Sequence, residues 1–189
     1  IDLGVKQPIC ISVSSHKYPI YVGNTYSVSE MKKRSESERR GAAKIAKDSK
    51  TGHGRKRAMK KFTQIKQREK NQTDSIFHKY SKEVVDIAIR YKVSKIVMED
   101  LSFGLDKQKL LKTFAPNKLQ NFIETKAKPN NIEVVYINPA YTSQTCSECG
   151  FLDKDNRETR DNFVCKSCNY NSNADFNAAK NIIKKKKKK

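Results

Sequence analysis

The sequence has no long apolar run. No stretch approaches the roughly 18 uninterrupted apolar residues of a membrane-spanning helix. The amino end also lacks the charged and then apolar pattern of a secretory signal. We therefore expect a protein of the cytoplasm without membrane contacts. An initiator methionine is absent too, and Ile1 already lies inside an apolar alternation, which favours a piece of a longer protein.

Acidic residues are scarce relative to basic ones, and the imbalance is local. The net charge is +20, and residues 31–70 hold 16 Lys and Arg against 4 Asp and Glu. Residues 184–189 add six lysines. Such concentrated charge suits a surface that binds a polyanion, because each neutralised phosphate releases counterions. The alternatives are a solvated helical face for residues 31–70 and an incidental, disordered end for the lysines.

The first half of the chain changes from strand to helix periodicity. Alternating apolar residues in 1–13 and 17–28 predict an antiparallel meander of three strands. From about residue 29 to residue 92 the sequence is long, charged and helix-favouring, and Gly52 and Gly54 interrupt it. We expect a basic helical hairpin there, with an apolar stripe on its second arm.

The middle of the chain predicts a parallel strand pair. Residues 94–101 (SKIVMEDL) form an apolar run that is too short for a helix and suits a strand buried on both faces. A loop with Gly104 leads to a predicted helix at 117–128 and a second strand at 132–139. A strand, helix and strand in this order favour a parallel pair. The expected fold class is α/β, a mixed sheet with flanking helices.

Four of the five cysteines form two CxxC pairs. Their spacing, C-x2-C-x15-C-x2-C, is that of a four-thiolate zinc site, and disulfides are the weaker explanation without a secretory signal. Four thiolates leave no coordination position for water, so we expect structural zinc. The ligands would be Cys146, Cys149, Cys165 and Cys168. The fifth cysteine, Cys10, is expected to be a small buried thiol.

Three acids occupy places where a charge needs a partner. Asp2 lies in the first predicted strand, Glu99 ends the apolar strand, and Asp175 shares the inward face of a final helix with Ala178 and Ala179. Each alone is an ordinary edge or helix-start acid. If the strands are adjacent and the helix crosses their ends, the three carboxylates converge. They could then hold two magnesium ions.

Five segments, taken in order, resemble the RuvC-like nuclease half of the TnpB family and the miniature type V CRISPR effectors: IDLG, VMEDL, YTSQTCSECG, FVCKSC and NADFNAAKNI. The resemblance implies an RNase H-like (RuvC) fold with Asp2, Glu99 and Asp175 as its acidic triad. Periodicity does not choose between Glu99 and Asp100, and the resemblance favours Glu99. It also implies that Arg157 lies near the scissile phosphate; the alternative is a solvent-exposed arginine.

The resemblance implies a division into three parts. Residues 1–140 would form the nuclease core with the basic hairpin, 141–170 a zinc ribbon that binds target nucleic acid, and 171–189 the last helix with a lysine-rich tail. Members of the family carry an amino-terminal half that grips the guide RNA, and we expect this half to be missing here.

The expected function is that of a nuclease fragment of an RNA-guided DNA endonuclease. It would use two Mg²⁺ ions to hydrolyse DNA phosphodiesters, with guide RNA and target DNA as partners. The alternatives are a catalytically inactive zinc-ribbon module that binds nucleic acid, and an assembly protein whose hairpin meets an acidic partner. The oligomeric state stays open, with a homodimer as one option. We expect a prokaryotic or phage-encoded protein that acts at the nucleoid.

Overall fold

The computed structural model describes residues 1–4, 8–49, 52–101 and 115–185, in a mixed α/β arrangement. The loop expected around Gly104 and lysines 186–189 lie outside these ranges. Within them, no helix is both long and apolar enough to cross a membrane. The elements are β1 (Ile9–Ile11), β2 (Ile20–Val22), α1 (Thr25–Asp48), α2 (His53–Arg90), β3 (Lys95–Glu99), α4 (Pro116–Ala127), η1 (Lys128–Asn130), β4 (Glu133–Ile137), η2 (Lys154–Asn156), β5 (Asn162–Val164), β6 (Asn171–Asn173) and α5 (Ala174–Lys184).

The amino-terminal strands form a smaller sheet than the alternation predicts. β1 and β2 pair antiparallel, with Cys10 opposite Tyr21. The expected third strand is reduced to one antiparallel bridge, in which Asp2 and Cys10 exchange two backbone hydrogen bonds of 2.9 Å. The Ile1 nitrogen donates to the carbonyl of Val97 at 2.8 Å, so this first segment also runs beside β3. It therefore links the two sheets.

The predicted parallel pair is present. β3 and β4 pair in parallel from Lys95 opposite Glu133 to Glu99 opposite Ile137, with α4 in the crossover. The expectation that β3 is buried on both faces is wrong in part. Its residues Ile96 and Met98 are in the core, whereas Val97 is half-buried because it borders an apolar cavity of about 250 Å³.

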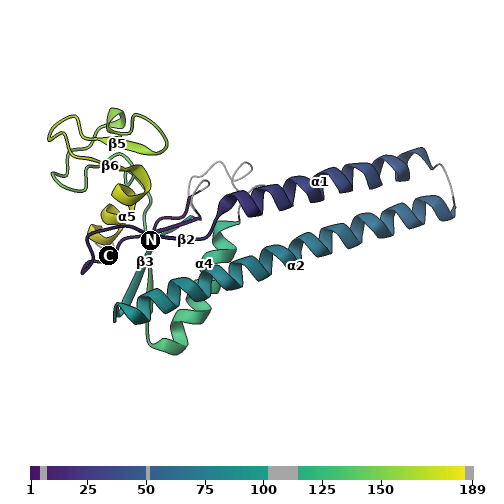
Figure 1. Ribbon diagram of the computed structural model, residues 1–189, viewed down its shortest axis with the longest axis horizontal. Helices are drawn as coiled ribbons and strands as arrows, with labels where there is room; N and C mark the ends of the chain where they lie inside the picture. The colour runs from purple at the N-terminus through teal and green to yellow at the C-terminus, as the bar shows by residue number, and fades with distance from the viewer. Residues whose placement is uncertain (5–7, 50–51, 102–114, 186–189) are drawn as a thin grey trace.

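The helical hairpin is also present, and it is the longest feature of the molecule (Figure 1). α1 spans 24 residues and α2 spans 38, and both extend away from α5 and the β5–β6 pair (Figure 1). Ion pairs join the arms, including Arg39 with Glu69 at 2.7 Å and Arg68 with Glu38. Most other basic side chains of the hairpin are exposed to solvent.

The base of the hairpin depends on a close approach between Gly23 and the Tyr80 ring. Gly23 has φ of 85°, and a Cβ atom added there would lie 2.6 Å from the Tyr80 ring. The Tyr80 hydroxyl and the Asn24 backbone hydrogen-bond to each other at 2.9 and 3.1 Å. Glycine is required here by both its backbone angle and its lack of a side chain.

We predict that Gly23→Ala lowers the free energy of unfolding by about 1–3 kcal/mol, because alanine is strained at this φ and contacts the ring. Gly41→Ala is the matched control. Gly41 is exposed within α1 and an added Cβ meets nothing within 4 Å. That change should stabilise the chain by about 0.5–1 kcal/mol through helix propensity. Urea unfolding of both variants checks the pair, and equal effects would contradict the account.

Candidate functional site

The two CxxC segments adopt the same backbone turn. In each, the amide of the first cysteine donates to the carbonyl five residues later at 2.9 Å. Its own carbonyl accepts from the amide four residues later at 3.0 Å. That fourth residue has positive φ, 80° at Gly150 and 57° at Asn169, conformations that glycine and asparagine tolerate best. We call these two turns the knuckles.

The knuckles bring four sulfur atoms to one point. Sγ of Cys146 lies 3.7 Å from that of Cys168, and Sγ of Cys149 lies 3.6 Å from that of Cys165. All four lie within 4.8 Å of one another, and no other trio of His, Cys, Asp or Glu among the described residues is this close. A tetrahedral ion with Zn–S bonds near 2.3 Å separates its sulfurs by about 3.8 Å. The cysteine set therefore fits zinc.

A buried asparagine joins the two knuckles. Asn156 is fully buried, and its Nδ2 donates to the carbonyls of Gln144 and Phe151 at 2.9 and 3.2 Å. Its Oδ1 accepts from the amide of Lys166 at 2.8 Å, beside the second knuckle. The amide thus satisfies backbone groups that the short β-structure leaves unpaired. Nothing in the sequence marked this residue.

The predicted acids line one cavity of about 350 Å³, which we call the acidic cavity. Asp2 comes from the bridged first segment, Glu99 from the end of β3, and Asp175 from the first turn of α5. Arg157 lies on the same cavity, with its Nη2 3.7 Å from Oδ1 of Asp175 and 3.0 Å from the carbonyl of Arg160. Arg157 is therefore part of the cavity wall.

Hydrogen bonds to the main chain fix the backbone at each acid. The bridge to Cys10 fixes Asp2, and Gln120 Nε2 donates to the carbonyl of Glu99 at 2.7 Å. Asn173 is the N-cap of α5, and its Oδ1 accepts from the amides of Asp175 and Phe176 at 3.0 and 3.2 Å. The Asp175 side chain is 18% exposed, in agreement with the predicted inward face.

Burial and neighbouring acids disfavour the charged form of Asp2. Burial, followed by the charges of Glu99 and Asp175, raises the pKa of Asp2 to about 7. Burial also raises the pKa of Glu99, against the hydrogen bond from Thr142, which lowers it. The charges of both other acids therefore act on Asp2. A bound cation would relieve this repulsion.

The three acids offer oxygen ligands, but their oxygens are less closely grouped than the four sulfurs. Carboxylate oxygens are also the ligands that magnesium prefers. Glu99 is among the residues lining the cavity, whereas the Asp100 amide continues the strand by donating to the carbonyl of Ile137 at 2.7 Å.

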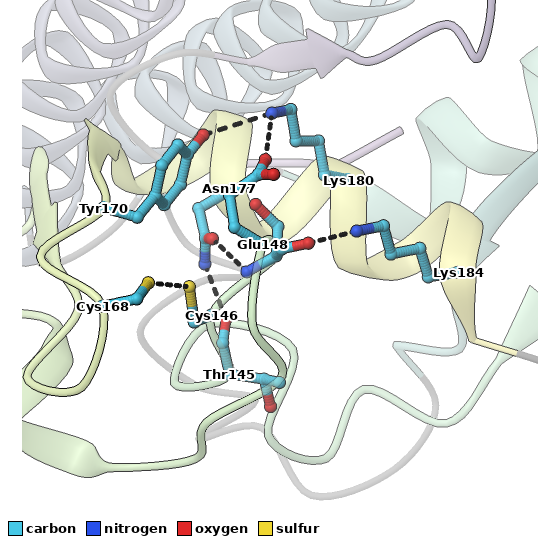
Figure 2. Close-up of polar contacts among 9 residues, drawn as sticks. Thr145, Cys146, Glu148, Cys168, Tyr170, Asn177, Lys180 and Lys184 are labelled. Atoms are coloured by element: carbon cyan, nitrogen blue, oxygen red, sulfur yellow. Dashed lines mark hydrogen bonds and ion pairs between the residues drawn. The ribbon is translucent and has the colours of Figure 1, made fainter.

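Buried amides on α5 connect the acidic cavity to the first knuckle. Asn177 Nδ2 donates to the Thr145 carbonyl at 2.8 Å, and its Oδ1 accepts from the Ser147 amide at 2.9 Å (Figure 2). Asn181 Nδ2 donates to the carbonyls of Thr142 and Thr145 at 2.9 and 2.6 Å. α5 therefore carries Asp175 in its first turn, and its later turns hydrogen-bond to the segment that leads into the first knuckle.

Sequence reasoning missed Thr142, Gln120, Asn177 and Asn181, although all four are buried polar residues. The spacing of Asn177 and Asn181 on one helical face, among alanines, was the available signal. The expectation for Cys10 is confirmed: it is 1% exposed and packs with Phe176 and Ala179.

Comparison with known proteins agrees with this arrangement. Residues 117–182 match the family described as Cas12f1-like, TNB domain. A CRISPR-associated endodeoxyribonuclease Cas12f1 of Syntrophomonas palmitatica is 39% identical over 71% of this chain and 33% of its own length. Its counterpart in Sulfoacidibacillus thermotolerans is 36% identical over 96% and 44%. A TnpB-like protein of Methanocaldococcus jannaschii is 36% identical over 62% and 44%.

The chain is a relative of the TnpB and miniature type V effector proteins. Solved structures agree: a CRISPR-Cas12f ternary complex superimposes with a TM-score of 0.79 at 29% identity, over 96% of this chain and 37% of that one. A Cas12f1–sgRNA–target DNA complex gives 0.74 at 25% identity, over 96% and 48%. The chain spans less than half the length of each of these relatives.

We predict that the chain binds one zinc ion and that Cys149→Ser abolishes this binding and unfolds the knuckles. Loss of a structural zinc forfeits roughly 10 kcal/mol of apparent binding free energy. Metal analysis and near-ultraviolet circular dichroism measure the two effects. Cys10→Ala is the control and should keep its zinc. Stoichiometric zinc in Cys149→Ser would refute the assignment.

We also predict a pH effect from Asp2. Its pKa is about 7 in the folded chain against an ordinary 3.8, so its contribution to stability is lost as pH rises toward and through 7. The free energy of unfolding of the zinc-loaded, magnesium-free wild type should fall between pH 6 and pH 8.5. In Asp2→Asn this fall should be smaller by about 1 kcal/mol. Urea unfolding at both pH values measures this, with Asp100→Asn as control. An unchanged pH dependence in Asp2→Asn would count against the shared cavity.

Proposed function

We propose that this chain is the nuclease part of an RNA-guided DNA endonuclease, with an RNase H-like (RuvC) fold. The proposal rests on the acidic cavity, where Asp2, Glu99 and Asp175 meet although they come from the start, middle and end of the chain. The relatives named as Cas12f1 endodeoxyribonucleases support the same reaction class. Hydrolysis of a DNA phosphodiester is the chemistry that such a carboxylate group performs with divalent cations.

In this mechanism the acids would bind two Mg²⁺ ions. Asp2, Glu99 and Asp175, which line the same cavity, would supply the carboxylate ligands. Bound magnesium supplies the positive charge that activates a water molecule and stabilises the leaving 3′ oxygen. Arg157, now paired with Asp175 at 3.7 Å, would contact a phosphate oxygen beside the scissile bond. No covalent intermediate is required.

The remaining parts of the chain would bind and orient the nucleic acid. We assign residues 1–140 to the nuclease core with the basic hairpin, 141–170 to a zinc ribbon that holds the target strand, and 171–189 to the last helix and its lysines. The exposed basic side chains of α1 and α2 suit the backbone of a guide RNA or an RNA–DNA heteroduplex. The relatives are more than twice as long, so guide and target recognition would involve parts that this chain does not match.

A second candidate is a nucleic-acid-binding module that does not cut. The knuckles and the basic hairpin favour it, because neither depends on the carboxylates. Such a module would bind nucleic acid tightly at low salt, with or without magnesium. The two candidates therefore differ in their metal requirement.

We predict that the zinc-loaded chain cleaves labelled single-stranded DNA only with Mg²⁺. Asp2→Ala, Glu99→Ala and Asp175→Ala should each lower the cleavage rate roughly 100-fold or more, since each removes an ion ligand. Gel analysis of products measures the rate, and a salt series of binding measurements runs alongside.

Asp100→Ala is the matched control, because Asp100 adjoins Glu99 in the chain and should leave cleavage unchanged. Full activity in any triad variant would remove that residue from the site. Salt-sensitive binding by the wild type without cleavage would favour the second candidate.

A further inference from the structure

Thr142 hydrogen-bonds to the Glu99 carboxylate at the end of β3. Its Oγ1 donates to Oε1 of Glu99, and the residue is only 5% exposed. The same oxygen lies 2.9 Å from the carbonyl of Pro139. A hydroxyl has one proton, so Thr142 can donate to only one of these acceptors at a time. An ionised Glu99 is the stronger acceptor of the two.

This contact restricts how the carboxylate can present its oxygens. The carbonyl of Glu99 is already fixed by Gln120, which leaves rotation of the side chain as the remaining freedom. A hydroxyl bound to Oε1 holds the plane of the carboxylate and leaves Oε2 for a cation. Outer hydrogen bonds of this type orient metal ligands and strengthen their binding.

The position of Thr142 is itself fixed from α5. Asn181, which is 8% exposed, uses its amide hydrogens on the carbonyls of Thr142 and Thr145 at 2.9 and 2.6 Å. Asn177 holds the same segment one turn earlier, at Thr145 and Ser147 (Figure 2). A continuous series of buried and partly buried hydrogen bonds therefore runs from the first knuckle through α5 to Glu99.

We propose that Thr142 is a positioning residue that orients Glu99 for divalent-cation binding, and that Asn181 keeps Thr142 in place. The inference rests on the proposed function, because it gives Glu99 a cation to hold. Thr142 also lines the acidic cavity, and its proposed role is exercised through its hydrogen bond to Glu99. Through the same hydrogen bonds, the orientation of the Glu99 carboxylate would also depend on an intact first knuckle.

The test measures Mn²⁺ binding to the zinc-loaded chain by isothermal titration calorimetry. Thr142→Val keeps the shape of the side chain and removes only the hydroxyl donor, and Asn181 still meets the backbone carbonyl. We expect Mn²⁺ affinity to fall about 10- to 100-fold, as for other residues that support metal ligands. Thr142→Ser, which keeps the hydroxyl, should restore affinity to within about 3-fold of wild type, a rescue that loss of packing alone would not produce.

Thr145→Val is the matched control, since the Thr145 hydroxyl donates to the carbonyl of Tyr141 at 2.8 Å and not to an acid. It should leave Mn²⁺ affinity unchanged, and zinc content should stay stoichiometric in all three variants. Wild-type affinity in Thr142→Val would overturn this inference alone. Wild-type chain that binds Mn²⁺ no better than Asp2→Asn would overturn both this inference and the proposed function.

Discussion

Crowding of three carboxylates in one half-buried cavity is the constraint on which the rest of the structure depends. The pKa of Asp2, raised to about 7 by burial and by its two acidic neighbours, shows how unfavourable the arrangement is without a cation. The fold opposes this repulsion with backbone contacts: the bridge to Cys10, the N-cap Asn173 and the Gln120 amide on Glu99. The cavity is therefore preorganised for positive charge.

The last helix connects this cavity to the knuckles. The apolar cluster among the knuckles is small, with Cys146, Phe163, Cys165 and Ala174 as its buried members. So little apolar area cannot fix a segment of this length, and a structural metal is the usual substitute in such small units. Asn177 and Asn181 hydrogen-bond the knuckle segment to α5, the helix that carries Asp175. A zinc ion held by the knuckles would therefore also stabilise one wall of the acidic cavity.

Local patterns predicted the parts of this fold that local chemistry decides. The CxxC spacing predicted the sulfur cluster, the apolar run at 94–101 predicted β3, and the inward face of the last helix predicted Asp175 as a cavity residue. The alternation from Ile1 overstated the first strand, which is reduced to a single bridge between Asp2 and Cys10.

The buried amides and Thr142 could not be predicted in the same way. Asn177, Asn181 and Thr142 reach partners 30 to 43 residues away, Gln120 reaches Glu99 across 21 residues, and no periodicity encodes such pairs.

Under the proposed function, the distribution of charge separates nucleic-acid binding from cleavage. The exposed lysines and arginines of the basic hairpin would attract a polyanion without bound magnesium, because counterion release needs only positive charge. The acidic cavity has the opposite requirement, since three carboxylates repel a phosphodiester and Arg157, already paired with Asp175, offsets only part of that charge. Under the proposed function, a phosphate would approach the cavity only after cations have reversed the charge of the cavity. Divalent cations would then act on the final approach of the strand and not on its first contact with the hairpin.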